Sequence, residues 1–198
     1  GLPALSLLYR LGAEVRVHAA AAGGCSPREL LGRLLNPPLW TMGLDDLPAR
    51  LVFDDLPFAA GETLVGGLRV RRQPVPHPGG CFAYRVEDPR TGGSLVLATD
   101  VEWSSAEGKS EQAFFDFARG CSVLLFDAHF TSRQLPDHEG WGHSSSRQAL
   151  SVAERAEVRQ LLLIHHAQHH MDAELEAIDR DVRQACPCAR LARDGDIL

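Results

Sequence analysis

Hydrophobic and polar positions change their period along the chain. Residues 13–18 alternate apolar and polar side chains, which predicts a half-buried strand. The segment Ser26-Pro27-Arg28-Glu29 follows with a serine for capping, a proline for the first helical position and a glutamate that completes a capping box. We therefore expect a helix that stops before Asn36-Pro37-Pro38, followed by a proline-rich loop as far as Pro48.

The stretch from Ala49 to Thr99 has the period of two that is typical of strands. Residues 81–86 alternate, residues 88–93 carry turn-forming residues, and residues 94–99 are an apolar run. These features predict a hairpin that delivers Asp100 at its far end.

After residue 109 the pattern changes to helices alternating with buried strands. A glycine closes the first helix, a Ser-Gln capping box opens the second, and Asp172 caps the last. Strands followed by alternating helices and strands predict one layered α/β domain over residues 1–198. The expected elements are a helix over 110–119, a strand over 122–126, a loop over 128–144, a helix from 145 to about 158, a strand over 160–164 and a helix over 172–185.

Composition and charge argue against several classes of function. The 198 residues carry a formal net charge of -6, so no general basic field attracts nucleic acid. No run of 18 apolar residues predicts a membrane span. Five cysteines, an odd number without framework spacing, indicate a reducing cytoplasm. Cys186 and Cys188 are too close for a usual zinc knuckle, and we expect all five cysteines to be reduced thiols.

Four residues able to bind a metal stand at or after the ends of apolar segments. They are His77, Asp100, His143 and His165. A residue that ends a strand lies at the rim of a sheet, and four converging ends would form a site of carboxylate and imidazole ligands. Each residue also has a plainer interpretation.

Asp100 is either a metal ligand or a helix cap or arginine partner, because a carboxylate at the end of a buried strand needs a partner. Prolines stiffen the loop of His77, which suits a ligand, although an exposed loop histidine fits equally well. His165 follows a strand and is the best ligand candidate of the histidine-rich run, where His169 and His170 are expected to be solvated.

His143 stands in a glycine-rich turn just before a helix N-terminus. Such a place favours an anion, so His143 could hold a phosphate or protonate a leaving group, or it is a neutral turn residue. Trp141 is expected to plug the loop, and Glu102 to lie behind the ligands or at the surface.

The order of these motifs resembles the metallo-β-lactamase superfamily, in particular the branch of ribonuclease Z and a class of cyclic-nucleotide phosphodiesterases. The series is His-Pro-Gly-Gly, strand-Thr-Asp, strand-Asp-Ala, Gly-His-Ser-Ser and strand-His, and it covers nearly the whole chain. The Gly-His-Ser turn with a strand-His about 20 residues later is its most specific part.

The resemblance implies an α/β fold of the αβ/βα sandwich type with a dinuclear metal centre at its edge. His77 would complete the first metal site, Asp100 would bridge both ions and take part in catalysis, and His165 would be the last ligand of the second site. His143 would protonate the leaving group after a bridging hydroxide attacks phosphorus. Two Zn²⁺ ions are the default, and Mn²⁺ or Fe²⁺ would suit the same ligands.

The chain departs from the family in one way, because the signature His-x-His-x-Asp-His is absent. Gly1-Leu2-Pro3 matches the helix start that follows the signature in relatives, so we expect a domain that lacks its first strands. His77, Asp100 and His165 alone cannot fill two sites, and we predict weak metal binding and little catalysis. An exposed sheet edge would favour association, for example as a homodimer.

The expected enzyme is a metal-dependent hydrolase acting on a small phosphodiester or nucleotide, with nucleic acid less favoured because of the acidic net charge. Two alternatives stay open. One is a non-catalytic binding module of the same fold, and the other is a thioester or lactone hydrolase.

Overall fold

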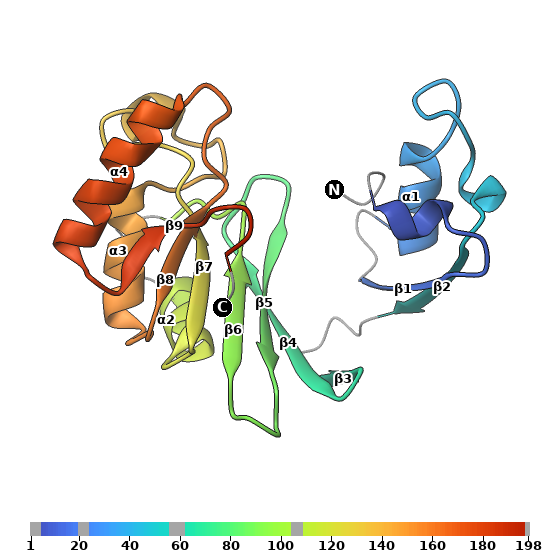
Figure 1. The fold of residues 1–198 in the computed structure, drawn as a ribbon, viewed down its shortest axis with the longest axis horizontal. Coiled ribbons are helices and arrows are strands. Elements are labelled where there is room, and N and C mark those ends of the chain that lie inside the picture. The colour runs from blue at the N-terminus through green and yellow to red at the C-terminus, as the bar shows by residue number, and fades with distance from the viewer. Residues whose placement is uncertain (1–4, 20–23, 56–61, 104–108, 197–198) are drawn as a thin grey trace. The chain divides into compact units, whose positions relative to one another are not determined.

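The computed structural model describes residues 5–19, 24–55, 62–103 and 109–196. The chain divides into two compact units, Gly1–Gly61 and Glu62–Leu198 (Figure 1). Each unit is described by itself.

The first unit pairs two parallel strands with a short capped helix. The predicted capping box is confirmed, because the Ser26 hydroxyl accepts a hydrogen bond from the Glu29 N–H at 3.2 Å and the Glu29 carboxylate accepts one from the Ser26 N–H at 2.7 Å. Leu8, Leu35 and neighbouring leucines form its core. Its elements are η2 (Ser6–Tyr9), β1 (Glu14–Ala19), α1 (Pro27–Leu34), η3 (Leu44–Asp46) and β2 (Arg50–Asp55).

The second unit contains a seven-stranded sheet whose strands follow one another in chain order (Figure 1). Neighbours from β3 to β6 are antiparallel, which includes the predicted hairpin, and neighbours from β6 to β9 are parallel. The strands are β3 (Thr63–Val65), β4 (Leu68–Val75), β5 (Cys81–Glu87), β6 (Ser94–Ala98), β7 (Val123–Asp127), β8 (Leu161–Ile164) and β9 (Ala189–Leu191).

Helices supply the crossovers that parallel strands require. The sheet and helices enclose an apolar core that includes Trp103, Phe114 and Phe126, and α3 packs on β7, β8 and α4. The predicted α/β class is confirmed. The helices are α2 (Lys109–Ala118), η4 (Leu135–His138), α3 (Ser146–Arg155) and α4 (Asp172–Ala185).

The parallel half of the sheet determines where the candidate ligands meet. Ala98 pairs with Phe126, and Asp127 pairs with Ile164, so β6, β7 and β8 end at one edge. Asp100 and His165 follow two of these ends. Side chains far apart in the chain therefore lie at one rim.

The expectation of reduced thiols is wrong for one pair. Cys186 and Cys188 form a disulfide across a turn, here called the Cys-Pro-Cys turn, which joins α4 to β9. Their Cα atoms lie 5.3 Å apart, within the range that a disulfide spans. The other three cysteines are free.

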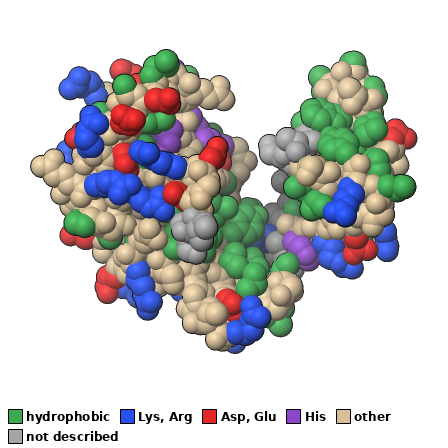
Figure 2. All heavy atoms as spheres, in the orientation of Figure 1, with side chains coloured by type: hydrophobic (Ala, Val, Ile, Leu, Met, Phe, Trp, Pro, Cys, Tyr) green, Lys and Arg blue, Asp and Glu red, His purple; other side chains and the backbone are tan. Residues whose placement is uncertain are grey.

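The surface agrees with the absence of a general basic field. Figure 2 shows arginine and acidic side chains interspersed over the visible face of the second unit. In the described part of the chain, no helix has the length and apolar character needed to cross a membrane.

Candidate metal centre

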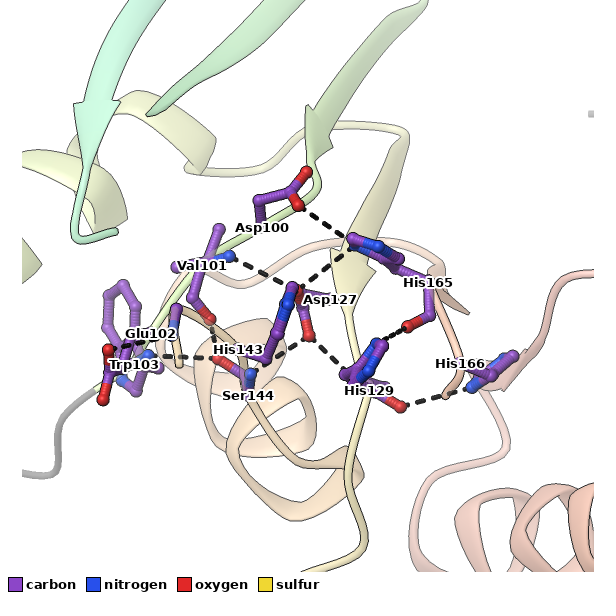
Figure 3. Close-up of polar contacts among 12 residues, drawn as sticks. Asp100, Val101, Glu102, Trp103, Asp127, His129, His143, Ser144, His165 and His166 are labelled. Atoms are coloured by element: carbon purple, nitrogen blue, oxygen red, sulfur yellow. Dashed lines mark hydrogen bonds and ion pairs between the residues drawn. The ribbon is translucent and has the colours of Figure 1, made fainter. Parts of the chain in front are cut away.

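Asp127, the last residue of β7, lies at the centre of the site and is fully buried. One carboxylate oxygen accepts the N–H groups of His129 and Ser144, each at 3.0 Å. The other accepts the Val101 N–H at 3.3 Å and Nδ1 of His143 at 2.8 Å (Figure 3). A buried carboxylate needs such partners, because an isolated charge is very costly in an apolar interior.

These contacts decide the charge of Asp127. Burial by itself would raise the pKa of the carboxyl, but interactions with His165, with His143 and with backbone N–H groups outweigh it and hold the pKa below its ordinary value. Asp127 is therefore a carboxylate and accepts hydrogen bonds only.

The tautomer of His143 follows from that charge. Since Asp127 only accepts, Nδ1 of His143 carries the hydrogen, and Nε2 is left for another partner. His143 lies in the turn before α3, where the Ser145–Gln148 capping box that the sequence predicts is confirmed. The hydrogen bond to Asp127 holds the ring itself, and the capping box fixes the turn that carries it.

Glu102 fixes the turn of His143 through hydrogen bonds. Its carboxylate accepts the N–H groups of Gly140 at 2.5 Å and Gly142 at 3.1 Å, and its own N–H donates to the Pro76 carbonyl at 2.8 Å. Glu102 therefore joins the loop of His143 to the loop of His77. At Gly142, where φ is +88°, an added Cβ would overlap the His77 ring, so this close approach requires glycine.

Asp100 and His165 are brought into contact. Nδ1 of His165 lies 3.6 Å from a carboxylate oxygen of Asp100 and 3.6 Å from one of Asp127. Hydrogen bonding to Asp127 raises the pKa of His165, against the opposing effect of burial. Both residues adopt left-handed backbone conformations, with φ of 40° for Asp100 and 61° for His165, as is common at functional sites.

His77 is placed less directly. Its ring centre lies 6.2 Å from that of His143, and no hydrogen bond or ion pair among the described residues joins it to Asp100 or His165. Its Nδ1 accepts the Gly79 N–H at 3.1 Å, so in the neutral ring the hydrogen is on Nε2. Coordination through Nε2 therefore requires the contact with Gly79 to be released.

Sequence reasoning missed two members of the site, Asp127 as its centre and His129. The His129 ring stacks on His143 with centres 4.2 Å apart and an interplanar angle of 18°. Its Nδ1 lies 2.7 Å from the His165 carbonyl oxygen. Burial lowers its pKa, despite that contact. The rule that singled out Asp100, a polar residue at the end of a buried strand, also fits Asp127 and His129.

The histidine-rich run after β8 divides into exposed and buried members. His169 is exposed, as expected. The expectation of a solvated His170 is wrong, because its side chain is buried and its Nε2 lies 3.2 Å from the Gln134 amide oxygen. The turn after His166 folds His170 back onto the loop that contains Gln134.

The donor set suits a divalent transition metal. One ligand atom from each of His129, His143 and His165 lies within 4.8 Å of the others, and the Asp100 carboxylate is adjacent to His165. Imidazoles and carboxylates together are typical ligands of zinc, iron and manganese.

The chain is similar to known proteins over most of its length. A family model described as the beta-lactamase superfamily domain matches residues 51–166, more than half of the chain. Ribonuclease BN of Escherichia coli (strain K12) is 25% identical over an alignment that covers 78% of this chain and 62% of the relative. The chain thus spans about 62% of the length of the curated relatives that it matches.

Solved structures show the same fold. The metallo-beta-lactamase fold protein YhfI from Bacillus subtilis gives a TM-score of 0.65 at 15% identity, covering 92% of this chain and 63% of that one. The short form of human tRNase Z gives 0.60 at 14% identity, covering 94% and 68%.

Proposed function

Because the chain belongs to the beta-lactamase superfamily, we propose that it is the greater part of a metal-dependent hydrolase of phosphodiester bonds. The observation that carries the proposal is the buried Asp127 carboxylate, which orients His143 and lies beside His165 at the rim where Asp100 also stands. In the proposal, His143 is a general acid beside residues that bind a cation.

The ligand roles follow from the residues at the rim. We assign Asp100 and His165 as ligands, and His77 as a third ligand once its contact with Gly79 is released. Bound divalent cations, zinc by default, would lower the pKa of a water molecule and neutralise charge on the phosphate. We expect weak metal binding by this set alone, because three ligands cannot fill two sites when each zinc usually takes three or four protein ligands.

His143 has the role of proton donor to the leaving oxygen. Asp127 holds its Nδ1–H, so Nε2 is the nitrogen that can deliver a proton. Glu102 keeps the ring in place through the glycine N–H groups of the same turn.

The proposed substrate class is a small phosphodiester or nucleotide. Relatives named as a ribonuclease and a tRNase support phosphodiester chemistry. The net charge of -6 supports a small substrate over a long nucleic acid.

The test compares hydrolysis of bis-p-nitrophenyl phosphate and of a thioester, using this chain and the chain extended by whatever coding sequence precedes Gly1. We expect metal-dependent cleavage of the phosphodiester by the extended chain and little by this chain alone, with the activity of the extended chain reduced about 100-fold or more by His143→Asn. The exposed His169→Asn variant is the matched control and should keep full activity. Cleavage of the thioester alone would reject the phosphodiesterase assignment.

A further inference from the structure

We propose that His129, His143 and His165 form a three-imidazole site that holds a single divalent transition-metal ion without the help of His77. The proposal rests on the proposed function only in taking this rim of the sheet to bind a cation. It assigns a ligand role to His129, which the expected set of His77, Asp100 and His165 does not include.

His129 is oriented as a ligand by its own backbone surroundings. The N–H of Ala128 donates to the Ile164 carbonyl and the carbonyl of His129 accepts the Ala167 N–H, so this segment is anchored to the chain around the end of β8. Nδ1 of His129 donates to the His165 carbonyl at 2.7 Å, since a carbonyl only accepts. Its remaining nitrogen, Nε2, has a free lone pair.

His143 and His165 show the same pattern. The Nδ1–H of His143 is bound to the Asp127 carboxylate, and two carboxylate oxygens lie 3.6 Å from Nδ1 of His165. In all three rings an acceptor faces Nδ1 and leaves Nε2 as the donor atom. Histidines that bind metals almost always have their second nitrogen held in this way.

The spacing of the rings fits one ion. The ring centres lie 4.2, 4.9 and 5.2 Å apart, with His165 nearly perpendicular to the other two rings (Figure 3). One ring nitrogen of each histidine lies within 4.8 Å of one in each of the other two. A tetrahedral ion with Zn–N bonds near 2.05 Å needs nitrogens about 3.3 Å apart. Small side-chain rotations toward a common point would provide that spacing.

The charge around the rings favours a cation. Among the described residues, neither Asp100 nor Asp127 forms an ion pair with an arginine or lysine. Two carboxylates beside three imidazoles thus lack a permanent positive charge. Three nitrogen donors favour Zn²⁺, Co²⁺ or Cu²⁺ over Mg²⁺, which prefers oxygen ligands.

The proposal has a consequence for His143. Its Nε2 has one lone pair, so the ring cannot bind an ion and deliver a proton from Nε2 at the same time. The one-ion form described here is therefore distinct from the form in which His143 acts as the acid.

The test measures metal binding and does not depend on enzymatic activity. The chain is freed of metal with a chelator and titrated with Zn²⁺ against a chromophoric competitor, and Co²⁺ absorption reports the coordination geometry. We expect one equivalent of Zn²⁺, no binding of Mg²⁺, and a loss of affinity of about tenfold or more in His129→Gln. The glutamine amide can still donate to the His165 carbonyl, which protects the fold. Thermal unfolding in chelator verifies folding, and His143→Gln should show the same loss.

The exposed His169→Gln is the control and should leave Zn²⁺ affinity unchanged, and His77→Gln tells the two ligand sets apart. Wild-type affinity in His129→Gln would overturn the proposal. If His77→Gln alone lost affinity, the ion would sit on the set of His77, Asp100 and His165, so this inference would fall while the hydrolase proposal stood. If the wild-type chain bound no Zn²⁺, the inference would fall and the hydrolysis assay would decide the proposed function separately.

Discussion

Replacing Asp127 by asparagine tests whether this carboxylate organises the site. Asparagine keeps one oxygen, which can still accept the N–H groups of His129 and Ser144. Its amide nitrogen then takes the place of the oxygen that faces the Val101 N–H and Nδ1 of His143. The N–H groups of Val101 and His143 would then face an N–H donor instead of an acceptor.

The cost can be worked out contact by contact. The His143 ring can recover a hydrogen bond by moving its hydrogen from Nδ1 to Nε2. The Val101 N–H cannot, because Val101 is fully buried and water does not reach it. An unsatisfied buried donor costs about 1–3 kcal/mol, and hydrogen bonds to a charged group are stronger than those to an amide. We therefore expect Asp127→Asn to lower the free energy of unfolding by about 3 kcal/mol.

The assay is urea unfolding in the presence of chelator, with hydrogen exchange of the β7 amides reporting the second unit. Nitrogen-15 spectra of the imidazoles show which nitrogen of His143 carries the hydrogen. Asp137→Asn, at an exposed aspartate of the same unit, is the control and should change stability by less than about 0.5 kcal/mol. The reasoning is refuted if Asp127→Asn costs no more than the control, or if His143 keeps its hydrogen on Nδ1.

Three further predictions test separate features. Gly142→Ala and Gly140→Ala both force alanine into a positive φ, which should lower the free energy of unfolding by about 1–2 kcal/mol each. Only Gly142→Ala places a Cβ on the His77 ring and should shift the NMR signals of that imidazole, so equal shifts in both variants would contradict the close approach. Burial by itself would raise the pKa of Asp179, but hydrogen bonds from the β9 backbone and from an arginine outweigh this effect and hold that pKa below its ordinary value. Its stabilisation is thus present above the unfolded pKa and lost as pH falls through the lower folded one, so the urea midpoints of wild type and Asp179→Asn should converge below about pH 4; a gap independent of pH would contradict this. For the Cys-Pro-Cys turn, alkylation of the denatured chain should label three cysteines before reduction and five after it; five labels without reductant would contradict the disulfide.

Local features were predictable because their causes lie within a few residues. Both capping boxes join a serine to a residue three positions later. The last helix lies where expected, but its N-cap is Met171 and not Asp172, which is the first helical residue. The strand ends at Asp100 and His165 were also predictable, because an apolar run followed by a polar residue is visible in the chain.

The centre of the site was not predictable in the same way. Asp127 ends an apolar run as Asp100 does, but its role as the central acceptor comes from donors up to 26 residues away in the chain. His129 acquires a directed lone pair only because a carbonyl 36 residues later accepts its hydrogen.

By itself, the sequence determined most elements up to the last helix, their order and the polar residues at the strand ends, since short-range hydrogen bonds and burial patterns act along the chain. It did not predict the final strand β9. Only the tertiary structure decided which nitrogen of each histidine points into the site, because parallel strands bring distant hydrogen-bond acceptors to one rim and each ring has one hydrogen to place.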